Sequence, residues 1–90
     1  MPRQKIPRRI CSIPKCSYFK PNGIPMPELE VIALADDERE AMCLVDNQGL
    51  QQIQAADAMG VSRQTLANLL KSGRKKVTDA LLNGKALKMK

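Results

Sequence analysis

The amino-acid sequence predicts an all-α fold, a bundle of about four helices organised around a helix-turn-helix. The chain of 90 residues has one Phe, one Tyr and no Trp, so its core must be aliphatic, which suits packed helices better than a β-sandwich. Gly60 interrupts a stretch of helical spacing between residues 51 and 71, as expected where two helices meet at a corner. We therefore expect one helical domain over residues 27–84, preceded by an extended arm and followed by a basic tail of residues 85–90.

Residues 1–26 are expected to form the extended, basic arm, because proline recurs too often there for a helix. Alternating apolar residues allow a short strand at 8–13. Three apolar side chains later in the arm, Tyr18, Phe19 and Ile24, favour docking on the rest of the chain. The arm is thus predicted to be extended but in contact with the helices.

Two helices are expected between the arm and the corner. The first begins near Pro27, because proline at the first helical position followed by acidic residues suits a helix N-terminus. The second begins at the capping residue Asp36 and ends before Gly49. Its spacing predicts a buried stripe of Ala41, Leu44 and Val45. Cys43 lies opposite that stripe and is expected to face solvent.

The corner has the residues that a helix-turn-helix requires. Gly60 tolerates the positive φ that closes a helix, and Ser62 can accept a hydrogen bond from the free N–H groups of the next helix. Val61, between them, is placed to fill the angle between the helices. The apolar residues expected to pack across this angle are Ala55, Ala56, Met59, Leu66, Leu69 and Leu70.

The last helix is predicted from about Arg63 to Leu82, a length of roughly 30 Å at 1.5 Å per residue. Gly73 lies in its apolar stripe, where glycine costs about 1 kcal/mol of helix propensity relative to alanine. We therefore expect Gly73 to permit a close approach between helices. The buried stripe is predicted to contain Leu66, Leu69, Leu70, Gly73, Val77, Ala80 and Leu81. After the stop at Gly84, alternating residues in the tail allow a short strand.

The net charge of +6 is unevenly distributed along the chain. Residues 1–20 contain six bases and no acid, whereas residues 28–46 contain seven acids and a single base. From Arg63 to the end there are eight bases, and Asp79 is the only acid. This second basic block coincides with the last helix, which favours a polyanionic partner.

The polar face of the last helix carries the residue types that read the major groove of DNA. Glutamine and asparagine can pair with adenine, arginine with guanine, and alanine can contact a thymine methyl group. Bases farther along the helix would neutralise phosphates, and the capped N-terminus offers one more phosphate contact. The predicted DNA-binding residues are Ser62, Arg63, Gln64, Ala67, Asn68, Lys71, Arg74 and Lys75. Secondary phosphate contacts are expected from Arg3, Lys5, Arg8 and Arg9.

A simpler interpretation makes this stripe only the solvated side of an amphipathic helix. Three features favour DNA binding over it. The stripe directly follows a glycine–valine–serine turn, and it contains no acid before Asp79. The small residue Ala56 also lies where the preceding helix must approach its partner closely.

Three cysteines and no histidine limit the other chemistry of the chain. A zinc site usually needs four Cys or His ligands, which one chain cannot supply, so we predict no metal site and no cofactor. Structural thiols are expected, and a redox or metal sensor that uses Cys11 and Cys16 is an open alternative. An enzyme is not expected, because the sequence has no His, no glycine-rich phosphate loop and no nucleophile–base pair.

Residues 36–81 resemble the helix-turn-helix of region 4 of bacterial primary sigma factors. Nearly the whole chain is similar, more closely, to a family of small uncharacterised bacterial and archaeal proteins predicted to bind DNA. The marks of that family here are PRRIC, YFKPNGIP, DE-x-EA…L-x-D-x-x-GL, AA-x-x-MGVSR-x-T and GKAL. Gln51 departs from the Ser or Thr cap that the family pattern has, and Cys43 departs from its charged residue. The resemblance implies DNA binding.

The expected partner is double-stranded DNA, and the expected function is transcription regulation. An adaptor that contacts RNA polymerase is the alternative from another class. We also expect a homodimer, because one recognition helix covers a single half-site and the long last helix leaves apolar residues for a partner's arm. The sequence has no membrane span and no signal peptide, so a cytoplasmic location is expected.

Overall fold

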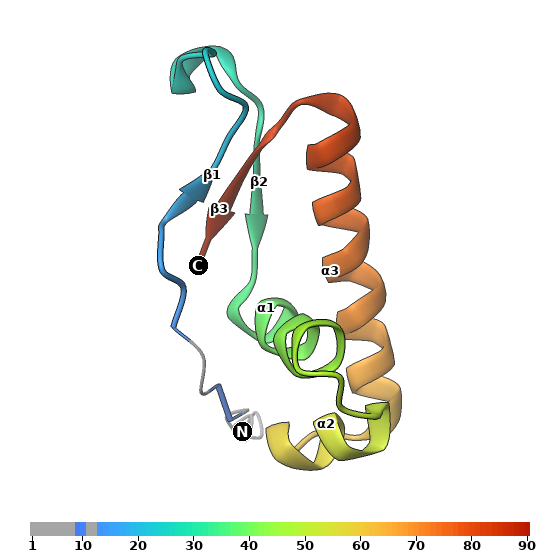
Figure 1. The fold of residues 1–90 in the computed structure, drawn as a ribbon. Helices are drawn as coiled ribbons and strands as arrows, with labels where there is room; N and C mark the ends of the chain where they lie inside the picture. Colours follow the sequence, from blue (N-terminus) through green and yellow to red (C-terminus); the bar gives the residue numbers. More distant parts are fainter. Residues whose placement is uncertain (1–8, 11–12) are drawn as a thin grey trace, which may run out of the picture.

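The computed structural model of the protein describes residues 9–10 and 13–90. Within these residues, three α-helices pack with a small three-stranded sheet (Figure 1). The elements in chain order are β1 (Tyr18–Phe19), the 3-10 turn η1 (Met26–Glu28), β2 (Val31–Leu34), α1 (Asp36–Met42), the π-helical turn η2 (Cys43–Asn47), α2 (Gln52–Met59), α3 (Arg63–Asn83) and β3 (Ala86–Met89). The long helix α3 meets α2 at its start and lies beside the sheet over its second half (Figure 1).

The prediction of an all-α bundle of about four helices is wrong, because a strand forms where the first helix was expected. Only the single 3-10 turn η1 forms around Pro27, and the chain continues as strand β2. The proline and the acids near this point do suit a helix start. However, β2 pairs along its whole length with β3, which follows α3 in the chain. This long-range pairing overrides the local helix signal.

The sheet joins the arm to the tail of the chain. Its strand order is β1-β3-β2, with β1 antiparallel and β2 parallel to the central strand β3. A parallel pair requires a long crossover, which the three helices provide. The short strand allowed in the tail is therefore confirmed as β3. The strand allowed at 8–13 is not seen in the described part of that range, and residues 8, 11 and 12 lie outside the described residues.

The helical core lies where α1, α2 and the first half of α3 meet. It consists of Ala41, Leu44, Ala55, Ala56, Met59, Leu66 and Leu70. Within the stripe predicted for α3, Gly73 and Ala80 are also buried, and Leu69 and Val77 are half-buried. Leu81 was expected to be buried but is 77% exposed, because successive helical residues point about 100° apart and its neighbour Ala80, only 5% exposed, takes the buried side. No helix of the described residues has the length and apolarity needed to cross a membrane.

Gly73 permits a close approach between α1 and α3, as predicted. A Cβ atom added at this position would lie 2.8 Å from Met42 Sδ and 3.3 Å from Glu38 Cβ. Real Cβ atoms do not approach other heavy atoms to 2.8 Å, so a larger residue would require Met42 to move and would press on Glu38 Cβ. The missing side chain thus allows α1 and α3 to pack closely at this point.

Cys43 is half-buried, so the expectation that it faces solvent is wrong. Cys43 lies at the start of the π-helical turn η2, which continues α1 from Cys43 to Asn47. A π turn holds more residues than an α turn, so it rotates the residues that follow relative to a regular helical wheel. Gln48 Nε2 donates a hydrogen bond to Cys43 Sγ at 3.7 Å.

Candidate nucleic-acid interface

The corner between α2 and α3 has the geometry that the sequence predicts. Gly60 adopts the left-handed conformation, with φ +70°, and its N–H donates to Asp57 O at 3.1 Å. The Val61 N–H donates to Ala56 O at 3.0 Å, so the carbonyls of Ala56 and Asp57 are satisfied within the turn. Ser62 then caps α3, since its Oγ accepts a hydrogen bond from the Thr65 N–H at 3.0 Å.

The start of α2 compensates for the missing Ser or Thr cap at Gln51. Gln54 Oε1 accepts a hydrogen bond from the Gln51 N–H at 3.0 Å. This is the return half of a capping box, in which the side chain of the fourth residue bonds back to the cap backbone. The first helix of the motif therefore keeps a defined N-terminus without a hydroxyl cap.

The exposed face of α3 holds most of the predicted DNA-binding residues. Arg63, Gln64 and Asn68 are exposed, and Ala67 is half-buried between them. Gln64 Nε2 donates to Asn68 Oδ1 at 3.1 Å, so the two amides already share one side of the helix. The other members, Ser62, Lys71, Arg74 and Lys75, are also exposed.

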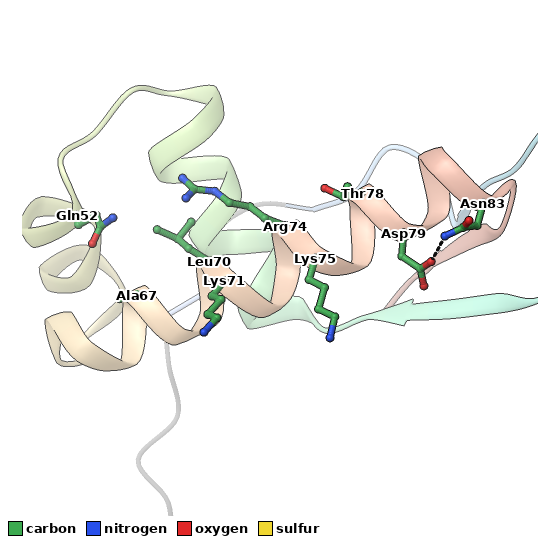
Figure 2. Close-up of a pocket in the computed structure, with 9 residues that line it drawn as sticks. All are labelled: Gln52, Ala67, Leu70, Lys71, Arg74, Lys75, Thr78, Asp79 and Asn83. Carbon is green, nitrogen blue, oxygen red and sulfur yellow. Dashed lines mark hydrogen bonds between the residues drawn. The ribbon is translucent and has the colours of Figure 1, made fainter.

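A groove of about 750 Å³ runs along this face of α3. Ala67 and Leu70 line its apolar part, and Gln52 of α2 lies across from them (Figure 2). Lys71 and Lys75, one helical turn apart, point to the same side of α3 (Figure 2). Neither lysine forms an ion pair with any residue that the structure describes. Their charges are therefore available to an anionic ligand.

Arg74 differs from these lysines because an acid holds it. Arg74 Nε donates to Asp46 Oδ2 at 3.0 Å, and Nη2 lies 2.6 Å from Oδ1. The hydrogen bonds from Arg74 lower the pKa of Asp46, and the same bonds raise the pKa of Arg74. The pair ties the end of η2 to α3, so part of the positive charge predicted for the interface is neutralised within the protein.

A buried carboxylate holds α1 against the second half of α3. Glu38 accepts hydrogen bonds from Lys76 Nζ at 2.7 Å, from Ser72 Oγ and from the Ala35 N–H at 2.9 Å. Burial by itself raises the pKa of Glu38, but these hydrogen bonds outweigh it, so the pKa lies below its ordinary value. This cluster was not predicted from the sequence, because its members come from distant segments with no shared local pattern.

The arm contributes Arg9 to the corner. The Arg9 N–H donates to Met59 O at 3.1 Å, and its guanidinium Nη2 donates to Asp57 O. Ile10 packs against the helical core. Of the four secondary phosphate contacts predicted for the arm, only Arg9 is described; the others, Arg3, Lys5 and Arg8, lie outside the described residues.

Part of the arm packs on its own chain. Strand β1 pairs with β3, and Ile10 contacts the core of the same chain. Three other apolar side chains of the arm stay exposed: Ile13 by 85%, Phe19 by 64% and Tyr18 by 41%. The homodimer stays a prediction.

The cysteines show no metal cluster in the described part of the chain. Cys16 is exposed and Cys43 is half-buried, and Cys11 lies outside the described residues. Among residues 9–10 and 13–90, no group of three or more His, Cys, Asp or Glu side chains could hold a metal ion.

The sequence as a whole matches a known family. The family model described as "Protein of unknown function DUF134" matches residues 1–90. The chain belongs to the DUF134 family. The predicted membership in a family of small bacterial proteins is thereby confirmed, and DNA binding by that family stays a prediction.

Relatives of this DUF134 chain occur in several bacteria. A UPF0251 protein of Aeromonas salmonicida is 63% identical over 89 residues, which cover 99% of this chain and 87% of the relative. A UPF0251 protein of Vibrio cholerae is 61% identical, with 97% of this chain and 89% of the relative covered. A UPF0251 protein of Moorella thermoacetica is 49% identical over 99% of this chain and 60% of its own length. No solved structure matches the chain significantly.

Proposed function

We propose that the protein binds double-stranded DNA through the first half of α3 and acts as a transcription regulator. One observation carries this proposal. A capped helix-turn-helix corner presents an exposed helix face that holds amides and bases but no acid before Asp79. A helix of this kind fits the major groove, where its first turns contact base edges.

The residues on this face divide into two roles. Gln64 and Asn68, whose amides share one side of α3, would pair with base edges, since an amide can bond to both N6 and N7 of adenine. Lys71 and Lys75 lie farther along α3 and would contact phosphates, which give affinity without sequence preference. Arg63 and Ala67 flank the amides, and the Ser62 end of α3 adds backbone N–H groups for a phosphate.

A titration of the protein against a fluorescent duplex at several salt concentrations tests DNA binding. The logarithm of the binding constant should fall linearly with the logarithm of the salt concentration, with a slope of about 0.9 per phosphate contacted. The alternative function, an adaptor that contacts RNA polymerase, predicts no duplex binding at low salt. Absence of binding to any member of a random duplex pool would therefore reject our proposal.

Selection of bound duplexes from the same pool separates the two residue roles. Alanine at Gln64 or Asn68 should cost about 1–3 kcal/mol of binding free energy on the selected site and much less on unrelated duplexes. Equal losses on selected and unrelated duplexes would show that the amides do not read bases. Sedimentation of the same samples reports whether the predicted homodimer forms.

A further inference from the structure

Strands β1 and β2 are the two edges of the sheet, and only β1 carries the residues that keep an edge from pairing. β1 is two residues long, and Lys20 and Pro21 follow it directly. Natural sheets place lysine and proline at their edges to prevent further pairing. β2 is four residues long, and its sequence VIAL contains neither a charge nor a proline. The edge formed by β2 is therefore able to accept another strand.

The hydrogen bonds between β2 and β3 show which backbone groups of β2 such a strand could use. The carbonyl oxygens of Glu30 and Leu34 accept hydrogen bonds from the chain around β3, at 2.9 and 3.1 Å. Successive residues of a paired strand direct their N–H and C=O groups to opposite sides, so those of Val31 and Ala33 point away from β3. No described strand pairs with this side of β2, and Val31 is 44% exposed. We call this side the free edge of β2.

Acidic side chains flank the free edge of β2 at both ends. Glu28 and Glu30 precede the strand and Asp36 follows it, and all three are exposed. Lys85 lies 3.1 Å from Glu30, whereas Glu28 and Asp36 form no ion pair among the described residues. Opposite charges that face each other across paired strands stabilise the pair, and like charges destabilise it. A strand that fits this edge therefore carries bases on both sides of an uncharged centre.

The same charges disfavour a second copy of the chain at this edge. Antiparallel pairing of two β2 strands would bring the acids that precede one strand next to the acid that follows the other, so like charges would meet at both ends.

We propose that the free edge of β2 binds an extended segment of a partner protein, in which bases flank a short stretch of β-branched residues. The segment adds a fourth strand to the sheet, and its backbone bonds to the outward groups of Val31 and Ala33. This edge belongs to the sheet beside the second half of α3, whereas the corner with α2 lies at the other end of that helix (Figure 1). The inference is therefore independent of the proposed DNA binding.

Selection from a phage-displayed library of random short peptides on the immobilised full chain tests this inference. Enriched peptides should carry Lys or Arg on both sides of a β-branched centre. A fluorescein-labelled copy of one of them should bind in an anisotropy titration, and replacing its flanking bases by Glu should weaken binding about tenfold. Hydrogen exchange at the Val31 and Ala33 amides should slow when the peptide is bound, because these N–H groups then donate to the added strand.

The decisive variant is Ala33→Pro, which removes an N–H group that points away from β3. The pairing with β3 uses the backbone of Ile32 and Leu34 and is kept, since proline is tolerated on an edge strand. The labelled peptide should bind about tenfold more weakly to this variant, as expected for one lost hydrogen bond. Val31→Pro removes the other outward N–H and serves if Ala33→Pro fails to fold.

A charge variant tests the flanks of the edge separately. Asp36→Lys should weaken binding of the basic peptide about threefold, because it replaces an attraction by a repulsion. Asp57→Lys is the matched control, since it makes the same change of charge at an exposed position of α2. It should leave the affinity for the peptide unchanged.

Three results would overturn the inference. One is a selection that enriches no peptide, or only peptides with acidic flanks. Another is a peptide whose affinity is unchanged by a folded proline variant of β2. The third is a wild-type chain that self-associates in sedimentation and becomes monomeric with Ala33→Pro, since a second copy would then occupy the edge. None of these measurements contains DNA, so failure of the proposed function would be seen separately, in the duplex titration.

Discussion

Two sides of α3 carry similar basic residues but use them differently. On the exposed side, Lys71 and Lys75 form no ion pair among the described residues, although Asp79 lies near Lys75, and both point to the same side of the helix (Figure 2). Toward the sheet, Lys76 bonds to buried Glu38, and Lys85, just after α3, lies 3.1 Å from Glu30 and 3.0 Å from Asp79. In one basic block of the sequence, some bases thus form ion pairs that hold the fold together, and others remain available to a ligand.

The acidic middle of the chain explains this division. Its acids fold against α3 and neutralise selected bases, namely Arg74 through Asp46 and Lys76 through Glu38. The bases left over lie on the side of α3 that continues the helix-turn-helix face. The positive charge of α3 is therefore neutralised on one side of the helix and left on the other.

The largest expected effect comes from separating α1 from α3 at Gly73. Gly73→Leu should lower the free energy of unfolding by about 3 kcal/mol, because its side chain would overlap Met42 Sδ and press on Glu38 Cβ. Lys75→Leu is the matched control, since it adds the same side chain on the exposed face of α3. Thermal melting measures both. Similar melting temperatures for the two variants would show that the close approach at Gly73 is not required.

The next largest effect concerns the corner that orients the first half of α3. Gly60→Val should cost about 2 kcal/mol, since a β-branched residue is strained at φ +70° and its Cβ would press on the Arg9 guanidinium. Gly60→Asn should cost less, because asparagine tolerates the left-handed conformation. Chemical denaturation gives both values, and equal losses would argue against backbone strain as the cause.

The stability of the fold is expected to depend on pH through Glu38, which joins α1 to α3. The pKa of Glu38 is lowered in the folded protein, so its ionised form stabilises the fold above the ordinary value of 4.5, and this contribution is lost as the pH falls through the folded pKa. Glu38→Gln should therefore cost about 1–2 kcal/mol at pH 7. The difference from wild type should shrink below the ordinary pKa. Denaturation curves that differ by the same amount at pH 7 and pH 3 would contradict this role.

The smallest expected effect concerns the ion pair between Arg74 and Asp46. Asp46→Asn removes the partner of Arg74, and because this pair is exposed the loss of stability should stay below about 1 kcal/mol. The released Arg74 should then contact a phosphate and steepen the salt dependence of duplex binding by about 0.9. An unchanged slope would mean that Asp46 does not keep Arg74 from the DNA.

The local features of the fold could be read from the sequence, and the long-range ones could not. Gly60, Ser62 and the spacing of Leu66 and Leu70 predicted the corner and α3, because helix caps and helical periodicity depend on nearby residues. The strand β2 was missed, since its hydrogen-bond partner β3 lies at the other end of the helical crossover. Its neighbours Pro25 and Pro27 gave only a 3-10 turn.

The candidate site follows the same rule. The exposure of Gln64 and Asn68 followed from the helical wheel. The pairing of Arg74 with Asp46 and the attachment of Arg9 to α2 depend on tertiary contacts, for which one sequence holds no signal. The sequence shows which residues are basic, and the structure shows which of these bases already form ion pairs within the protein.

The most direct test compares two matched pairs of exposed lysines in the same duplex titration. Replacing Lys71 and Lys75 by Gln should reduce the salt slope by about 1.8, the amount expected for two phosphate contacts. Replacing Lys88 and Lys90, exposed in and after β3, removes the same charge far from the corner and should leave the slope unchanged. Equal effects of the two pairs would contradict our account, because binding would then depend on net charge and not on the exposed side of α3 that carries Lys71 and Lys75.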